Sequence, residues 1–178
     1  MGLDGHLYRT SKRRVEASKK FGEIRKAYSK DIEALVGKPK WKELMDSLPK
    51  NEFGHYDWDS YTKEQKVRMG NLRRAVHRVA KKHGLSLGKD LRPIFDGEQF
   101  GLDETDLLME LAYFDRDWDL HNFIIDNFWK DKERDNLVEV YLTKDDVKKI
   151  VSAGYKEGFV EALSCWDDDH VVFYYPWY

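Results

Sequence analysis

Two short stretches of the chain combine carboxylates with histidine at spacings that are compatible with a bound metal ion. The first is Asp-Arg-Asp-Trp-Asp-Leu-His at positions 115–121, and the second contains His55, Asp57 and Asp59. Oxygen and nitrogen ligands of these types bind Mg²⁺, Mn²⁺ or Zn²⁺. On a helix, Asp117 and His121 are four residues apart and could reach one ion, but the same spacing produces an ordinary hydrogen bond or ion pair. We predict hydrogen bonding and no metal, because a metal site needs further convergent ligands; metal binding at either stretch stays an open alternative.

Other catalytic signatures are missing from the sequence. The strand expected around Glu139 lacks the lysine two residues later that a restriction-type nuclease requires, and no glycine-rich phosphate loop ending in Gly-Lys-Ser/Thr occurs. Cys165 is the single cysteine, which excludes an intrachain disulfide and a cysteine-based zinc site. It is expected to be a small core residue. We therefore predict a protein that acts by binding, with no catalytic residues and no cofactor; a metal-dependent hydrolase is the third alternative.

Carboxylates are concentrated in the second half of the chain and suggest a protein partner. An acidic array could imitate the phosphates of a nucleic acid and occupy the groove of a host protein, and complementary charge would speed that encounter. The alternative is an ordinary solvated face. The candidate partner-binding residues are Asp115, Asp117, Asp119, Asp126, Asp167, Asp168 and Asp169.

Cations are concentrated on a predicted helix over residues 62–83. Thr62 and Gln65 have the spacing of a capping box at its start, and Gly84 is suited to its end. The clustered Lys and Arg side chains could follow phosphates without reading bases. Aromatic residues of the preceding loop, 50–61, could stack on bases, although the expectation for each of them is a place in the core. The candidate nucleic-acid-binding residues are Lys66, Arg73, Arg74, Arg78, Lys81 and Lys82.

Hydrophobic periodicity predicts the elements that position these residues. Strands are predicted at 3–8, 137–142 and 170–175. Helices are predicted at 15–36, 39–48, 62–83, in the second part of 103–129, after Thr143, and at 159–166. The segment 9–14 is expected to be a loop. The order of strand, several helices, strand, helix and strand predicts an α+β fold in which a small antiparallel sheet packs with helices.

The charge of the chain is divided between its two halves. Residues 1–92 contain 23 Lys/Arg and 12 Asp/Glu, a balance of +11, whereas residues 93–178 contain 8 and 21, a balance of −13. Such asymmetry suggests one surface for an anionic partner and another for a cationic partner. The alternative is that the two halves attract each other within the fold.

Composition is typical of a globular protein from a reducing compartment. The 178 residues are 41% hydrophobic and 14% aromatic, which is enough apolar surface for one well-cored domain and argues against disorder. No signal peptide is recognisable at the start, and no run of about eighteen apolar residues occurs. We therefore expect a cytoplasmic protein without a membrane partner.

Several motifs resemble a family of small phage and prophage proteins of unknown function. Members begin Met-Gly-Leu-Asp, carry a central Tyr-Trp-Arg-Lys-Ala-Asn-x-Ile-His-x-Trp-Phe motif, and continue with a strand, a capped acidic helix and a Phe-Tyr-Tyr ending. The corresponding residues here are Met-Gly-Leu-Asp at 1–4, Tyr113, Phe114, Arg116, Leu120, His121, Phe123, Val-Tyr-Leu-Thr at 140–143, and Phe-Tyr-Tyr at 173–175. The match covers residues 1–9 and about 105–178, and it departs from the family at 115–118, which reads Asp-Arg-Asp-Trp.

The resemblance implies an origin in a phage or mobile element, and it implies no activity. It makes the chain a single domain, residues 1–178, with a basic helical insertion at 10–104 and an acidic α+β portion at 105–178. Accessory proteins of phages often antagonise host defences, so our first hypothesis is an anti-CRISPR-like inhibitor of a host-defence nucleoprotein in the host cytoplasm. Direct nucleic-acid binding by the helix at 62–83 is the alternative.

Overall fold

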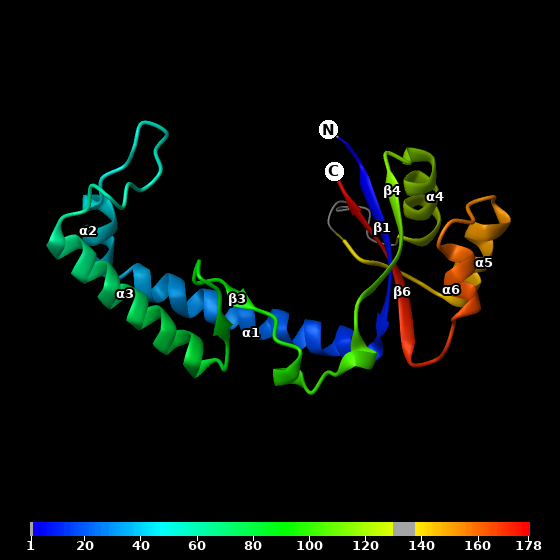
Figure 1. The fold of residues 1–178 in the computed structure, drawn as a ribbon, viewed down its shortest axis with the longest axis horizontal. Helices are drawn as coiled ribbons and strands as arrows, with labels where there is room; N and C mark the ends of the chain where they lie inside the picture. Colours follow the sequence, from blue (N-terminus) through cyan, green and yellow to red (C-terminus); the bar gives the residue numbers. More distant parts are fainter. Residues whose placement is uncertain (1, 130–137) are drawn as a thin grey trace. The chain divides into compact units, whose positions relative to one another are not determined.

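The computed structural model describes residues 2–129 and 138–178, and the chain divides into two compact units. Residues 1–17 and 97–178 form what we call the sheet unit, and residues 18–96 form the helical unit. In sequence, the helical unit is inserted between two strands of the main sheet (Figure 1). The helical unit carries 19 Lys/Arg against 11 Asp/Glu, whereas the sheet unit carries 12 against 22. The division of charge therefore follows the division into units.

The sheet unit contains a four-stranded antiparallel sheet with the strand order β4-β1-β6-β5. Its strands are β1 (Asp4–Ser11), β4 (Met109–Asp115), β5 (Val140–Leu142) and β6 (His170–Trp177). The central pair, β1 and β6, is joined over its whole length, from Asp4 opposite Trp177 to Ser11 opposite His170. This sheet and the helices around it confirm the predicted α+β class.

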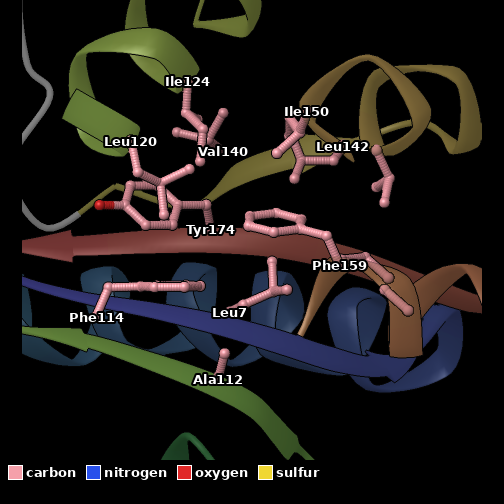
Figure 2. Packing of buried hydrophobic residues seen from close by; sticks show 13 residues of the cluster. Leu7, Ala112, Phe114, Leu120, Ile124, Val140, Leu142, Ile150, Phe159 and Tyr174 are labelled. Atoms are coloured by element: carbon pink, nitrogen blue, oxygen red, sulfur yellow. The ribbon is translucent and has the colours of Figure 1, made fainter. Parts of the chain in front are cut away.

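One face of this sheet carries the hydrophobic core of the sheet unit. Successive residues of a strand point to opposite faces, so Leu3 and Leu7 are buried while His6 between them is partly exposed. In Figure 2, Leu7 lies below Tyr174 and Phe159, which have no exposed surface. The same cluster contains side chains from α4 (Trp118–Phe128), α5 (Lys144–Ser152) and α6 (Phe159–Ser164). These three helices therefore pack on the same face of the sheet.

Side-chain caps determine where two of these helices begin. The Thr143 hydroxyl accepts a hydrogen bond from the backbone N–H of Asp146, and the Asp146 carboxylate accepts one from the backbone N–H of Thr143, at 3.2 and 2.9 Å. The carboxylate of Asp117 accepts a hydrogen bond of 3.0 Å from the backbone N–H of Leu120 at the start of α4. Each cap satisfies N–H groups that have no partner within the helix.

The helical unit is built on three helices and a small hairpin (Figure 1). Its elements are most of α1 (Lys12–Val36), α2 (Pro39–Ser47), α3 (Lys63–Lys82), β2 (Ser86–Leu87) and β3 (Pro93–Ile94). The core includes Tyr28 from α1, Leu44 from α2 and Val76 from α3. The capping box predicted for Thr62 and Gln65 opens α3, with reciprocal hydrogen bonds of 2.8 and 3.2 Å. Two 3₁₀ helices, η1 (Glu98–Phe100) and η2 (Glu104–Asp106), belong to the sheet unit.

The segment 9–14 is not the predicted loop. Thr10 and Ser11 continue β1 by pairing with Val171 and His170 of β6, and α1 begins at Lys12. The backbone hydrogen bonds of this pairing outweigh the polar character of the segment. Hydrophobic periodicity did not decide the secondary structure of the first part of 103–129, and this part contains β4. The strand predicted at 137–142 begins at Val140, and its first position, 137, lies outside the described residues.

Candidate nucleic-acid interface

The six basic candidate residues all lie on the side of α3 that faces away from the core of the helical unit. Arg73, Arg74, Arg78, Lys81 and Lys82 are exposed and Lys66 is partly exposed. With about 100° of rotation per residue, the six occupy roughly half of the helix circumference. The other half contains the buried residues Leu72, Ala75, Val76 and Ala80. We call the exposed half the basic face.

Two further basic side chains of this face were not among the candidates. Lys63 and His77 are exposed, and a helical wheel places both of them within the same half of α3. The buried residues Leu72, Ala75, Val76 and Ala80 define which side of this wheel faces the core. The sequence therefore allowed these two residues to be placed on this face, once the apolar residues of the helix had been assigned to the core.

Most cations of the basic face have no carboxylate partner. Of the six candidates, only Lys82 has one within 4.0 Å among the described residues: its Nζ atom donates to Asp31 at 2.9 Å. The hydrogen bonds from Lys82 and His83 hold the pKa of Asp31 below its usual range. Arg74 donates instead to the neutral Asn71 side chain at 2.6 Å. The positive charge of this face is therefore mostly uncompensated at short range.

Three aromatic side chains of the loop before α3 are exposed, contrary to the expectation that each would be in the core. The exposed fractions are 75% for Phe53, 47% for Tyr56 and 55% for Trp58, whereas Tyr61 is buried. The backbone N–H groups of Phe53 and His55 both donate to the side chain of Asn51 at 3.0 Å. These hydrogen bonds close a tight turn, which keeps the loop tip away from the core.

The aromatic loop is connected to the basic face through Trp58. The Nζ atom of Lys66 lies 6.0 Å from the centre of the Trp58 ring, a cation–π geometry. Next to this ring is a groove of about 200 Å³ in the helical unit. It is lined by Trp58, Met69, Gly70, Leu72, Arg73, Val76 and Leu91. A Cβ atom added at Gly70 would meet nothing within 4 Å, so the glycine leaves the groove open.

The acidic candidates do not form one surface. Asp115 pairs with Asp4 at one end of β1, whereas residues 167–169 immediately precede His170, which pairs with Ser11 at the other end. At about 3.3 Å per residue, the length of β1 separates the two ends by roughly 23 Å. Asp119 and Asp126 are exposed on α4.

Three of these carboxylates already have partners within the sheet unit. Asp115 lies 3.5 Å from the guanidinium Nε of Arg116. Asp117 caps α4, as described above. Asp167 accepts hydrogen bonds from the guanidinium of Arg9 at 2.5 Å and from the imidazole of His170 at 2.7 Å. The hydrogen bond from His170 is the main reason that the pKa of Asp167 falls to about 2.

In both stretches considered for metal binding, the side chains make hydrogen bonds within the protein. His121 is only 2% exposed, and its Nδ1 atom lies 3.5 Å from the Tyr174 hydroxyl, while the Asp117 carboxylate bonds to backbone. In the other stretch, the Ser60 hydroxyl donates to Asp57 and holds the pKa of that carboxyl below its usual range. Within the described ranges, no group of three or more His, Cys, Asp or Glu side chains is placed to hold a metal ion.

Comparison of the chain with protein-family models, curated proteins and solved structures finds no match. Among residues 2–129 and 138–178, no helix has both the length and the apolar character needed to cross a membrane.

Proposed function

We propose that this protein binds nucleic acid through the basic face of α3. The observation that carries the proposal is the set of five Lys and Arg side chains on one helix face for which the described residues provide no carboxylate partner. Such cations are available for phosphates, and their binding releases the counterions condensed on the nucleic acid.

The dimensions of the basic face suit a phosphate backbone. From Lys66 to Lys82 the face extends about 24 Å along the helix axis. Duplex DNA carries one charge per about 1.7 Å of axis, so a helix of this length can contact several phosphates. Contacts of this kind supply affinity without sequence information.

The exposed aromatic residues favour a single strand over a duplex. Phe53, Tyr56 and Trp58 present ring surface in the loop before α3, and Trp58 lies beside Lys66 of the basic face. Unpaired bases stack on such rings with little dependence on sequence. In a duplex the bases are already stacked on each other, so these rings would contribute little.

The inhibitor hypothesis receives less support from the geometry. A phosphate mimic needs a continuous acidic surface, whereas the acidic candidates are divided between the two ends of the sheet and three of them have internal partners. Because of the motifs at 1–9 and 105–178, the proposal includes an origin in a phage or mobile element. A protein of that origin would meet single-stranded nucleic acid in the host cytoplasm.

Fluorescence anisotropy with a labelled single-stranded oligonucleotide tests the proposal directly. The full chain is titrated at two salt concentrations, together with a triple variant Arg74→Glu, Arg78→Glu and Lys81→Glu. We expect the variant to lose affinity by about 100-fold at low salt, since three attractive contacts become repulsive.

A matched charge reversal on α5 provides the control. Lys144, Lys148 and Lys149 are exposed cations of the sheet unit, and their replacement by Glu should have little effect on binding. Equal losses in both triple variants, or no binding by the unmodified chain at low salt, would rule the proposal out. Capture of a host protein that survives nuclease and high salt would favour the inhibitor hypothesis instead.

A further inference from the structure

The second face of the main sheet is lined by aromatic side chains. Because α4, α5 and α6 pack on the opposite face, the alternate residues of each strand point away from the core. The strand register brings together His6 with Tyr113 and Tyr175, Tyr8 with Phe173, and Tyr141 with Phe173. We call this set the aromatic face; its members are His6, Tyr8, Tyr113, Tyr141, Phe173 and Tyr175.

The rings of the aromatic face form a continuous row across all four strands. The ring centres of Tyr113 and His6 are 5.0 Å apart, and those of His6 and Tyr8 are 5.6 Å apart and stacked. The row continues from Tyr8 to Phe173 at 5.4 Å and from Phe173 to Tyr141 at 5.5 Å. Phe173 in the middle is buried, whereas Tyr113 and Tyr141 at the two ends are 48% and 39% exposed. Ring surface is therefore accessible on both outer strands.

Carboxylates accompany these rings. The Tyr113 hydroxyl donates a hydrogen bond to Asp4 at 2.7 Å, and the Tyr141 hydroxyl donates one to Glu139. The side chain of Glu110 lies 3.4 Å from Nδ1 of His6. Burial and the hydrogen bond to Glu139 raise the pKa of Tyr141, so its hydroxyl stays protonated and remains a donor. The face thus combines π surfaces with fixed negative charge.

We propose that the aromatic face binds an arginine-rich segment of a protein partner. A guanidinium group stacks on a tyrosine ring and pairs with a carboxylate through two parallel hydrogen bonds. Tyrosine rings and carboxylates are the two kinds of group that this face presents side by side. The negative balance of the sheet unit adds long-range attraction for such a segment. This proposal does not depend on nucleic-acid binding by α3, because it concerns a different unit of the chain.

A nucleic acid is the other partner that an aromatic sheet face can bind, since some RNA-binding sheets stack bases on their rings. Bases bring phosphates with them, and a sheet that binds them needs cations nearby. Three carboxylates, those of Asp4, Glu110 and Glu139, contact these rings. Arg116, a cation whose charge acts on Tyr113, is itself paired with Asp115 at 3.5 Å. The three carboxylates would repel phosphates, so charge favours the cationic peptide.

The test measures binding of a labelled nonapeptide of alternating arginine and glycine to the full chain by fluorescence anisotropy. A peptide with glutamate in place of arginine serves as the reference. We expect the arginine peptide to bind at least about tenfold more tightly, and Tyr113→Leu to weaken its binding about fivefold. Asp4→Asn should weaken it about threefold while keeping an acceptor for the Tyr113 hydroxyl.

The controls separate this proposal from the proposed function. Phe53→Leu removes an aromatic ring that is 75% exposed in the helical unit, and it should leave peptide binding unchanged. The α3 triple variant should likewise keep peptide binding while it loses the oligonucleotide. Equal affinity for the two peptides, or unchanged binding in both Tyr113→Leu and the isosteric Asp4→Asn, would overturn the proposal. Loss of oligonucleotide binding in Tyr113→Leu would also overturn the proposal, because it would show that the aromatic face binds nucleic acid.

Discussion

The hydroxyl of Ser11 donates a hydrogen bond of 2.5 Å to the carboxylate of Asp106, which lies 95 residues further along the chain. Ser11 is the last residue of β1 and Asp106 the last residue of η2, so the bond joins the two ends between which the helical unit is inserted. Both residues are buried, and the Ser11 oxygen also accepts a hydrogen bond from the backbone N–H of Arg14. One side chain therefore caps α1 and closes the base of the insertion.

Ser11→Ala should lower the stability of the sheet unit. The variant loses an N-cap, worth about 1 kcal/mol, and leaves the buried Asp106 without its hydroxyl donor. We expect the melting temperature to fall by about 3 °C or more, as followed by circular dichroism. Ser11→Thr keeps the hydroxyl and should melt close to the unmodified chain. Equal melting temperatures for the alanine and threonine variants would show that the hydroxyl has no such role.

Gly5→Ala should destabilise the sheet through a steric conflict with Tyr174. A Cβ atom at position 5 would lie 2.6 Å from the Tyr174 hydroxyl oxygen and 2.9 Å from its ring, and Tyr174 is completely buried. Overpacking of this kind costs about 1–3 kcal/mol, measurable as a shift of the urea midpoint.

Two variants check the steric cause at position 5. Gly22→Ala in α1, where an added Cβ atom meets nothing within 4 Å, should be neutral or slightly stabilising because alanine favours a helix. Combining Gly5→Ala with Tyr174→Phe should cost less than the sum of the two single changes, because the closest clashing atom is gone. Strict additivity would contradict the clash.

Asp167 should make stability depend on pH only in strong acid. Its pKa is lowered to about 2, mainly by the hydrogen bond from His170, whereas the unfolded chain has the ordinary value near 3.9. A lowered carboxyl pKa stabilises the fold above about pH 4, and this contribution is lost as the pH falls toward 2. Because the side chain is 44% exposed, we expect a contribution of about 1 kcal/mol or less. In urea unfolding, Asp167→Asn should be less stable than the unmodified chain at pH 7 and equally stable at pH 2. Asp168→Asn should have the stability of the unmodified chain at both pH values.

The salt dependence of nucleic-acid binding should report the individual cations of α3. Each lost phosphate contact reduces the slope of log affinity against log salt by about 0.7–1. We expect this reduction for Arg78→Gln and for Lys81→Gln. Lys82→Gln should change the slope less, because Lys82 is already paired with Asp31 at 2.9 Å. The same slope in all three variants and in the unmodified chain would exclude the basic face as the phosphate contact.

Filling the groove beside Trp58 should reduce binding of a single strand more than binding of a duplex. Trp58→Ala removes a stacking surface, and Gly70→Met occupies the groove, so each should weaken single-strand binding about 5- to 50-fold. Gly70→Ala gives α3 a comparable gain in helix propensity without filling the groove, and it should bind as the unmodified chain does. Competition titrations with both substrates measure the two affinities. An equal loss of affinity for single strand and duplex would contradict a stacking role.

The sequence by itself determined the features that depend on a few neighbouring residues. Reciprocal hydrogen bonds between Thr62 and Gln65 and between Thr143 and Asp146 form over three residues, so their spacing was sufficient to place the starts of α3 and α5. The basic face of α3 follows from the same local geometry, since a helix with a known start and buried stripe fixes the direction of every side chain.

Only the tertiary structure decided the features that depend on pairing between distant segments. β4 is a strand because Met109–Asp115 pairs with β1 more than a hundred residues earlier, and nothing in its local pattern specified that partner. The pairing of β4 and of β6 with β1 sends Asp115 and Asp167 to opposite ends of the sheet and aligns His6, Tyr113 and Phe173 in one row. A helix is made of contacts within one turn, which a sequence displays directly; a sheet is made of contacts between remote strands, whose register appears only when the chain has folded.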